Sequence, residues 1–279
     1  MTRTRRDITP LLEPASIALL GASDDPTRIG GRPLRYLREA GFKGRIYPVN
    51  PNRELVQGMR AYKTLADLPE APELVLVALP ANLTVGALGD AAARGAKAAI
   101  VFSAGFAETG TIGAALQEEI AAIAASTGMR VLGPNCLGAF NAELGYFGTF
   151  TQSMDRAFPK PGNIAVVSQS GAYGSHIAYL ARERGMGVKY WITTGNEVDV
   201  DVAESLLWLV RRPDVSVVMA YAEGIRDQDT FVAALGYARR HRKAIVFMKV
   251  GRSAIGAEAA ASHTAALAVA DAIYDAVFR

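Results

Sequence analysis

The segment IALLGASDDPTRIGG, residues 17–31, determines the expected fold of the first half of the chain. Its four leading apolar residues predict a buried strand, and the loop that follows leads into a helical pattern. A loop that ends a strand and opens a helix can turn backbone N–H groups toward a phosphate. The segment therefore predicts a strand–loop–helix unit with a nucleotide-like ligand at its glycine-rich loop. Glycines that only close a tight turn are the alternative.

Short apolar runs alternate with helical patterns further along the chain. The other strands expected in this half are residues 45–49, 74–78, 98–102 and 130–132. Such alternation is typical of a parallel sheet covered by helices. The clearest helix is expected over residues 116–125, where strong helix formers precede an exit signal.

A polar, proline-containing stretch, TQSMDRAFPKPGN at residues 151–163, separates this series from a second one. The strands expected in the second series are residues 164–167, 189–193, 215–220 and 244–249. Linkers of this composition are typical of domain boundaries. We therefore expect two parallel α/β domains, residues 1–150 and 151–279.

The composition argues against several classes of function. The chain has 279 residues with 30 basic and 27 acidic side chains and no long charged block, so neither a nucleic-acid partner nor a membrane surface is expected. The apolar run 74–81 is too short to span a bilayer, and MTRTRR at the start lacks the apolar core of a secretory signal. A cytoplasmic location is expected. One cysteine and three scattered histidines offer no disulfide and no structural metal site.

An NAD-binding interpretation of the first half lacks two features. It needs G-x-G-x-x-G spacing and an acidic residue after the second strand to hold the ribose hydroxyl. Here the loop is longer, and the second strand ends in YPVNPNRE, residues 47–54. Arg53 instead offers a cation to a phosphate, although a solvated surface arginine is the alternative.

The second series has its own candidate anion site in AVVSQSGA, residues 165–172. It places Ser168, Ser170 and Gly171 between a buried strand and a helix, where hydroxyls and helix N–H groups can bind a phosphate. An ordinary serine N-cap is the alternative.

Taken together, these motifs resemble the α-type half of acyl-CoA synthetases that form a nucleoside diphosphate, a family that includes succinyl-CoA synthetase and ADP-forming acetyl-CoA synthetases. The motifs occur in family order across nearly the whole chain: GASDDPTRIGG, YPVNP, SAGFAE, GPNCLG, VVSQSGA, TGNEVDVD, YAEGIRD, KVGRS and ASHT. The resemblance implies a CoA-binding Rossmann-like domain followed by a flavodoxin-like ligase domain.

The same resemblance implies roles for single residues. His263, in ASHT, would accept a phosphoryl group, and a neutral imidazole suits that task near pH 7. Glu223, in YAEG, would orient the histidine through its other ring nitrogen. Ser168, Ser170 and Gly171 would hold the phosphoryl group. The residues that would line the CoA site are Gly21, Ser23, Gly30, Arg53, Phe102, Ser103 and Asn135.

The implied activity is that of an acid–thiol ligase. It interconverts a small carboxylic acid, CoA and ATP with acyl-CoA, ADP and phosphate, through an acyl phosphate. The nucleotide step needs ATP or ADP and Mg²⁺ on an ATP-grasp partner, and an oligomer is expected.

Two positions depart from the family pattern, because Ala265 and Val269 stand where glycines are usual. The family's next strand would follow Arg279, so an incomplete second domain is expected. A CoA-binding regulatory module without turnover is the main alternative, and a nicotinamide-dependent oxidoreductase is a weaker one.

Overall fold

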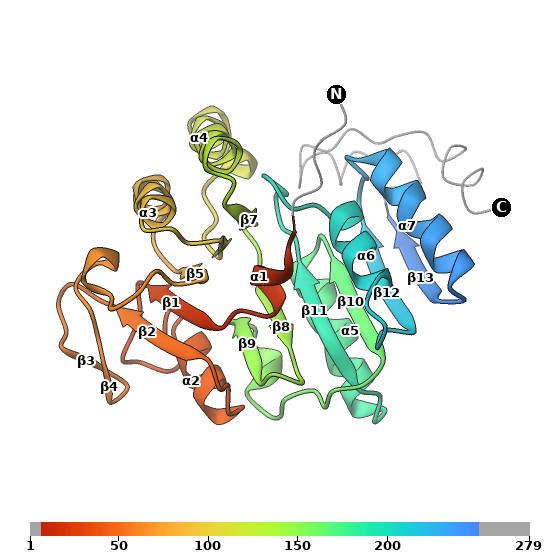
Figure 1. Cartoon of the computed structure of the whole chain (residues 1–279), viewed down its shortest axis with the longest axis horizontal. Helices are drawn as coiled ribbons and strands as arrows, with labels where there is room; N and C mark the ends of the chain where they lie inside the picture. The colour runs from red at the N-terminus through yellow and green to blue at the C-terminus, as the bar shows by residue number, and fades with distance from the viewer. Residues whose placement is uncertain (1–6, 251–279) are drawn as a thin grey trace.

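The computed structural model describes residues 7–250, which form two sheets side by side (Figure 1). The first sheet has the strand order β2–β1–β5–β6–β7, and every neighbouring pair is parallel. Its strands are β1 (Ser16–Leu20), β2 (Arg45–Val49), β5 (Leu74–Val77), β6 (Ala98–Val101) and β7 (Arg130–Leu132). Its helices are α1 (Thr9–Leu12), α2 (Arg32–Glu39), α3 (Ala81–Ala93) and α4 (Thr111–Thr127). A two-stranded ribbon, β3 (Leu55–Val56) and β4 (Met59–Arg60), lies in the connection after β2.

Both faces of the first sheet are covered by helices, as its continuous apolar strands predict. Leu19 belongs to one hydrophobic cluster with Leu34 of α2. Its neighbour Leu20 points to the opposite face, in a cluster with Leu88 of α3 and Ile120 of α4. This arrangement leaves the carboxyl ends of the strands as the open edge where loops can meet a ligand.

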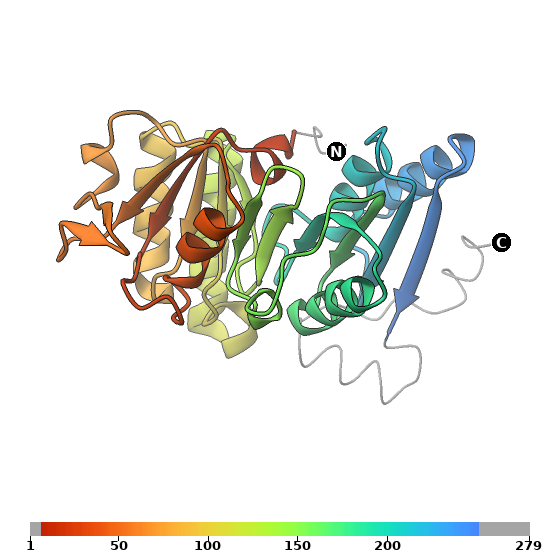
Figure 2. The same ribbon diagram turned by 90° about the horizontal axis from the view of Figure 1, so that it is seen from below.

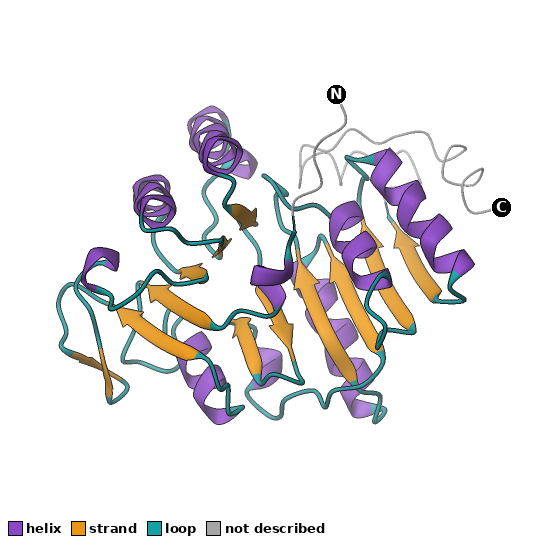
Figure 3. Cartoon of the chain, viewed as in Figure 1, coloured by secondary structure: helices purple, strands orange, loops and turns teal. Residues whose placement is uncertain are grey.

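The second sheet has the order β13–β12–β10–β11–β8–β9. Its strands are β8 (Gly138–Asn141), β9 (Tyr146–Thr149), β10 (Ile164–Ser168), β11 (Val188–Thr193), β12 (Val217–Ala222) and β13 (Ala244–Lys249). Its helices are α5 (Gly171–Glu183), α6 (Val202–Val210) and α7 (Gln228–Arg240). Val167 shares a cluster with Leu206 of α6 and Phe231 of α7, whereas Val166 shares one with Ala178 of α5. Figures 2 and 3 show the resulting layers of helix on both sides of the strands.

The doubly wound α/β architecture expected from the sequence is confirmed, and each of the nine expected strands is present within two residues of its expected bounds. The β8–β9 hairpin was not expected. Its strands are short and pair antiparallel, β8 with β11 and β9 with β8, although they precede the polar stretch 151–163. Helix α2 packs against β9, so the hairpin forms the edge of the second sheet that contacts the first domain. The boundary between residues 150 and 151 stays a prediction.

A buried ion pair also joins the two halves. Arg130 of β7 donates to Asp199 at 2.9 Å and, through two nitrogens, to Glu204 of α6 at 3.0 and 2.5 Å. The side chains of Arg130 and Asp199 are only 4% and 2% exposed, so this contact is shielded from solvent. No helix within residues 7–250 is long and apolar enough to cross a membrane.

Candidate functional site

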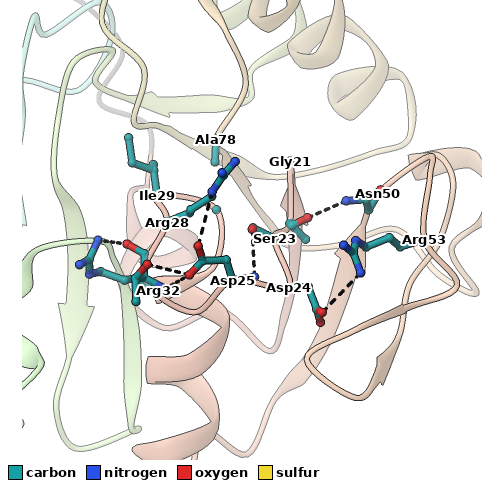
Figure 4. A pocket seen from close by; sticks show the side chains of 13 residues that line it. Gly21, Ser23, Asp24, Asp25, Arg28, Ile29, Arg32, Asn50, Arg53 and Ala78 are labelled. Atoms are coloured by element: carbon teal, nitrogen blue, oxygen red, sulfur yellow. Dashed lines mark hydrogen bonds and ion pairs between the residues drawn. The ribbon is translucent and has the colours of Figure 1, made fainter.

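The loop after β1 and the start of α2 enclose a pocket of about 800 Å³ (Figure 4). Four of the residues expected to bind CoA line it: Gly21, Ser23, Gly30 and Arg53. The other lining residues are Ala22, Asp24, Asp25, Thr27, Arg28, Ile29, Arg32, Asn50 and Ala78. The pocket lies at the carboxyl end of the first strand, which is where the loop sequence places a ligand.

Two of the glycines are required by the packing of the loop itself. Gly21 has a φ of +74°, and a Cβ there would lie 2.4 Å from the carbonyl oxygen of Ala78. A Cβ on Gly30 would lie 2.0 Å from the carbonyl oxygen of Gly21. The turn therefore needs glycine with or without a ligand, and these two positions alone do not distinguish a phosphate site from a tight turn.

Three arginines give the pocket its cationic character. Arg53 pairs with Asp24 at 3.4 Å, and its side chain is about half exposed. Arg28 pairs with Asp25 at 3.5 Å (Figure 4), while Arg32 is largely buried at the side of the pocket. A phosphate could exchange with these surface carboxylates, because exposed ion pairs are weak. Arg53 was expected from the sequence, whereas Arg28, in the loop before α2, and Arg32, the first residue of α2, were not.

The remaining residues assigned to CoA lie outside this pocket. Phe102 is buried and packs edge-on against Phe150, with ring centroids 5.2 Å apart. The hydroxyl of Ser103 donates to the carbonyl oxygen of Leu79. Asn135 has a φ of +58°, and its N–H donates to the carbonyl of Ser103 at 2.8 Å. Ser103 and Asn135 thus lie together at the carboxyl edge of the first sheet, and their contact with CoA stays a prediction.

The candidate phosphate loop of the second half lies between β10 and α5. The hydroxyl of Ser168 is buried and donates to the carbonyl oxygen of Ser170 at 2.7 Å. Ser170 is the N-cap of α5, and its side chain accepts from the N–H of Tyr173 at 3.2 Å. Both hydroxyls are therefore engaged within the loop. The N–H groups of Gly171 and Ala172, at the start of α5, are the donors that a phosphate would meet.

Glu223 directly follows β12, at the same edge of the sheet as this loop. Its N–H donates to Oε1 of Gln169 at 2.5 Å. Its Oε2 is buried and has no hydrogen-bond partner among residues 7–250. A buried acceptor without a donor is unfavourable, so this oxygen is suited to receive an N–H from a further group.

His263 lies outside the described residues. The other two histidines have ordinary surroundings: His176 is exposed on α5, and His241 caps α7 and donates from Nδ1 to the carbonyl oxygen of Tyr237 at 2.9 Å. Cys136 is buried, and burial raises the pKa of its thiol to about 12. Its burial fits the role of a small hydrophobic core residue.

A buried polar cluster beside Glu223 was not expected from the sequence. Glu197 is 4% exposed, and its carboxylate accepts from Nε2 of Gln169 at 2.9 Å. Burial and the nearby charge of Asp201 raise the pKa of Glu197 to about 7. The signal available in the sequence was the acidic run TGNEVDVD directly after a buried strand. Within residues 7–250, no group of three or more His, Cys, Asp or Glu side chains is arranged to hold a metal ion.

Two α/β units, each with a largely parallel sheet and a candidate anion site at its carboxyl edge, define a doubly wound α/β protein. Residues 15–142 match the CoA binding domain family, and residues 161–279 match the succinyl-CoA ligase like flavodoxin domain family. The chain belongs to the acyl-CoA synthetases that form a nucleoside diphosphate, of which it carries these two domains.

Individual relatives agree with this assignment. The chain is 35% identical over 266 residues to the alpha subunit of acetate–CoA ligase [ADP-forming] II from Pyrococcus furiosus, covering 95% of this chain and 57% of that subunit. It is 37% identical to trans-feruloyl-CoA synthase FCS1 from an unknown prokaryotic organism, covering 95% of this chain and 38% of that protein. Among solved structures, it matches dinucleotide-forming acetyl-coenzyme A synthetase 1 from Ca. Korarchaeum cryptofilum, in complex with phosphate and ADP, with a TM-score of 0.89 and 36% identity. That match covers 98% of this chain and 57% of the solved chain.

Proposed function

We propose that this chain supplies the CoA-binding and phosphohistidine-bearing part of an ADP-forming acyl-CoA synthetase. The observation that carries the proposal is the buried Oε2 of Glu223, which lacks a donor among residues 7–250. His263, which lies outside the described residues, would supply that donor from one ring nitrogen. The other ring nitrogen would then be free to accept a phosphoryl group, since the tautomer of a histidine is fixed by the hydrogen bond its partner nitrogen makes.

The reaction begins with acyl-CoA and phosphate. A phosphate oxygen attacks the thioester carbon, the C–S bond breaks, and CoA leaves as the thiol while an acyl phosphate forms. The free ring nitrogen of His263 then attacks phosphorus, and the carboxylate leaves. The phosphoryl group finally moves from nitrogen to the terminal phosphate of ADP, which gives ATP, and each step is reversible.

The residues of this chain would act through charge and position. Glu223 would stabilise the cationic ring that forms as His263 takes the phosphoryl group. The N–H groups at the start of α5, with Ser168, Ser170 and Gly171, would face the phosphoryl oxygens, where the helix dipole favours negative charge.

The nucleotide step would take place with an ATP-grasp partner. That partner would bind ADP or ATP with Mg²⁺, because phosphoryl transfer relies on cations to neutralise charge. The two domains matched here are a CoA-binding domain and a flavodoxin-like domain, which supports the proposal that the nucleotide site would belong to the rest of the enzyme. The small carboxylic acid, the oligomer and the cytoplasmic location are parts of the same proposal.

Phosphoryl labelling of the enzyme tests the proposal directly. The complete enzyme, incubated with ATP labelled in its γ-phosphate, should give an acid-labile and base-stable phosphoprotein. His263→Asn should abolish the label, because it removes the nucleophile, and leave the CoA affinity within about twofold, because none of the residues that line the candidate CoA pocket is changed. His176→Asn and His241→Asn are the matched controls and should label like the wild type.

Two outcomes would contradict it. Label that persists in the His263 variant, or that is lost with His176 or His241, would refute the assignment of the phosphohistidine. CoA binding without label in any form of the enzyme would favour the regulatory module without turnover.

A further inference from the structure

The dipeptide Asn196–Glu197 lies at the seam between the two sheets. The N–H of Asn196 donates to the carbonyl of Pro134 at 2.9 Å, and its side chain accepts from Nδ2 of Asn135 at 3.3 Å. Glu197 has a φ of +58°, a left-handed conformation that costs energy in any residue with a Cβ. A strained, buried glutamate persists only where its surroundings hold it, so its contacts indicate what it does.

The carboxylate of Glu197 is surrounded by donors. Its Oε1 accepts from the hydroxyl of Thr194 at 2.8 Å and from the N–H of Val202 at 3.0 Å. Its Oε2 accepts from Nε2 of Gln169 at 2.9 Å and faces Nε of Arg226 at 3.6 Å. A side-chain amide in this place would point its NH₂ group at another donor. The arrangement therefore fits a carboxylate better than its uncharged isostere.

Gln169 connects this carboxylate to Glu223, the residue proposed to orient His263. Its Nε2 is shared between Glu197 and the carbonyl of Gly224, each at 2.9 Å. Its Oε1 accepts from the N–H of Glu223 at 2.5 Å and from the N–H of Gly224 at 3.2 Å. The carboxylate of Glu197 thus fixes which way the amide of Gln169 points, and that amide fixes the backbone on which Glu223 stands.

We propose that Glu197 is a positioning residue for the phosphohistidine site, acting through Gln169 on the backbone of Glu223. The proposal rests on the proposed function, because Glu223 matters to the reaction only if His263 is the phosphoryl carrier. Arg226 supports the same geometry from the opposite side: it donates to the backbone carbonyls of Asn196 and Glu197 at 3.0 and 3.1 Å.

The pH dependence follows from the groups that face Glu197. Burial and Asp201, the N-cap of α6, raise its pKa to about 7, while Gln169 and Thr194 oppose the shift as donors and Arg226 as a cation. As the pH rises through about 7, the carboxylate forms and accepts from all of its donors. Positioning of Glu223 should therefore strengthen with pH over this range.

The test compares Glu197→Gln with the wild type in the complete enzyme. The measured quantity is the initial rate of phosphoryl labelling from ATP labelled in its γ-phosphate, at several pH values from 6 to 8.5. The variant should label about tenfold more slowly at pH 8, as is typical when a group that orients a site residue is removed. The ratio of wild-type to variant rate should rise with pH, and because His263 is present in both, its own titration cancels in that ratio.

A matched control separates positioning from general stability. Glu204→Gln, on α6 a few residues after Glu197, weakens the ion pair with Arg130 but removes no hydrogen bond to Gln169, and this variant should label at the wild-type rate. CoA affinity, measured by calorimetry, should stay within about twofold in both variants. If Glu197→Gln does not fold, Gln169→Met breaks the same connection without changing a buried charge. This variant should show the same decrease in the rate of phosphoryl labelling.

The outcomes distinguish the two proposals. A wild-type enzyme that takes no label at His263 overturns the proposed function and this inference with it. A labelled wild type whose Glu197 or folded Gln169 variant labels equally fast overturns the role of Glu197 alone. An equal loss in the Glu204 variant, or a rate ratio that does not change with pH, would show that Glu197 acts only on stability.

Discussion

At the scale of single residues, Arg53 is the position where the loop chemistry can be tested most simply. Its guanidinium lies beside the glycine-rich loop, about half exposed and paired only weakly with Asp24. Such a group can exchange its carboxylate for a phosphate at little cost, since exposed ion pairs contribute less than about 1 kcal/mol. The 3′-phosphate of CoA is the remote phosphate that it would meet.

We therefore expect Arg53→Ala to weaken the binding of CoA about tenfold, because one charge-assisted contact is lost. The binding of dephospho-CoA, which lacks the 3′-phosphate, should be weakened much less. Calorimetry with both ligands measures the difference, and Arg60→Ala is the matched control, because Arg60 is a nearby exposed arginine that does not line the pocket. Equal losses for the two ligands would remove Arg53 from this role.

At the scale of elements, the junction between β7 and α6 depends on one buried cation. Arg130 donates hydrogen bonds to both Asp199 and Glu204. Asp199 lies on the segment that leads into α6, and Glu204 lies on α6 itself. Removing the cation would leave buried negative charge uncompensated. Leaving a buried charge without its partner lowers the free energy of unfolding by more than the intact ion pair contributes to it.

Arg130→Met should accordingly lower the free energy of unfolding by about 3 kcal/mol. Urea denaturation followed by circular dichroism measures the change. Arg45→Gln breaks the exposed pair with Glu70 and should shift the midpoint far less, because solvent already screens that contact. If the two variants shifted the midpoint equally, the buried pair would not be what holds β7 against α6.

At the scale of the whole molecule, the two candidate anion sites lie on different sheets. The first sheet presents the pocket of Gly21 and Arg53, and the second presents the start of α5 and Glu223. The chain spans 38% to 57% of the length of the relatives and the solved chain described above. The nucleotide step is therefore proposed for the part of the enzyme that these two domains do not include.

The pure 279-residue chain should accordingly bind CoA but should not release ADP from ATP when an acid and CoA are present. Adding the ATP-grasp part should restore the release. A coupled assay for ADP, with and without that part, measures both states. Robust CoA-dependent release of ADP by the chain alone would show that the partner is not needed.

Much of this architecture could be read from the sequence, because apolar runs and helix-forming stretches are local signals. The run at residues 17–20 and the loop from Gly21 to Gly31 predicted β1, its turn and α2, and the structure confirms them. Strand β8 gave no such signal. Its residues pair antiparallel with β11, about 50 positions later, and pairing at that distance depends on the assembled sheet and not on local pattern.

The sequence by itself determined the residue types at each strand end: glycines where the chain turns sharply, serines where a helix begins, and acids after β11 and β12. Only the tertiary structure decided which of these groups share one environment. Glu197 looked like one acid among three in TGNEVDVD, and Ser168 looked like a ligand-facing hydroxyl. Folding buries both, turns the serine toward its own loop and joins the glutamate to Glu223 through Gln169. The reason is physical: burial and hydrogen-bond geometry depend on segments distant in sequence, and they decide whether a polar side chain binds a ligand or positions another residue.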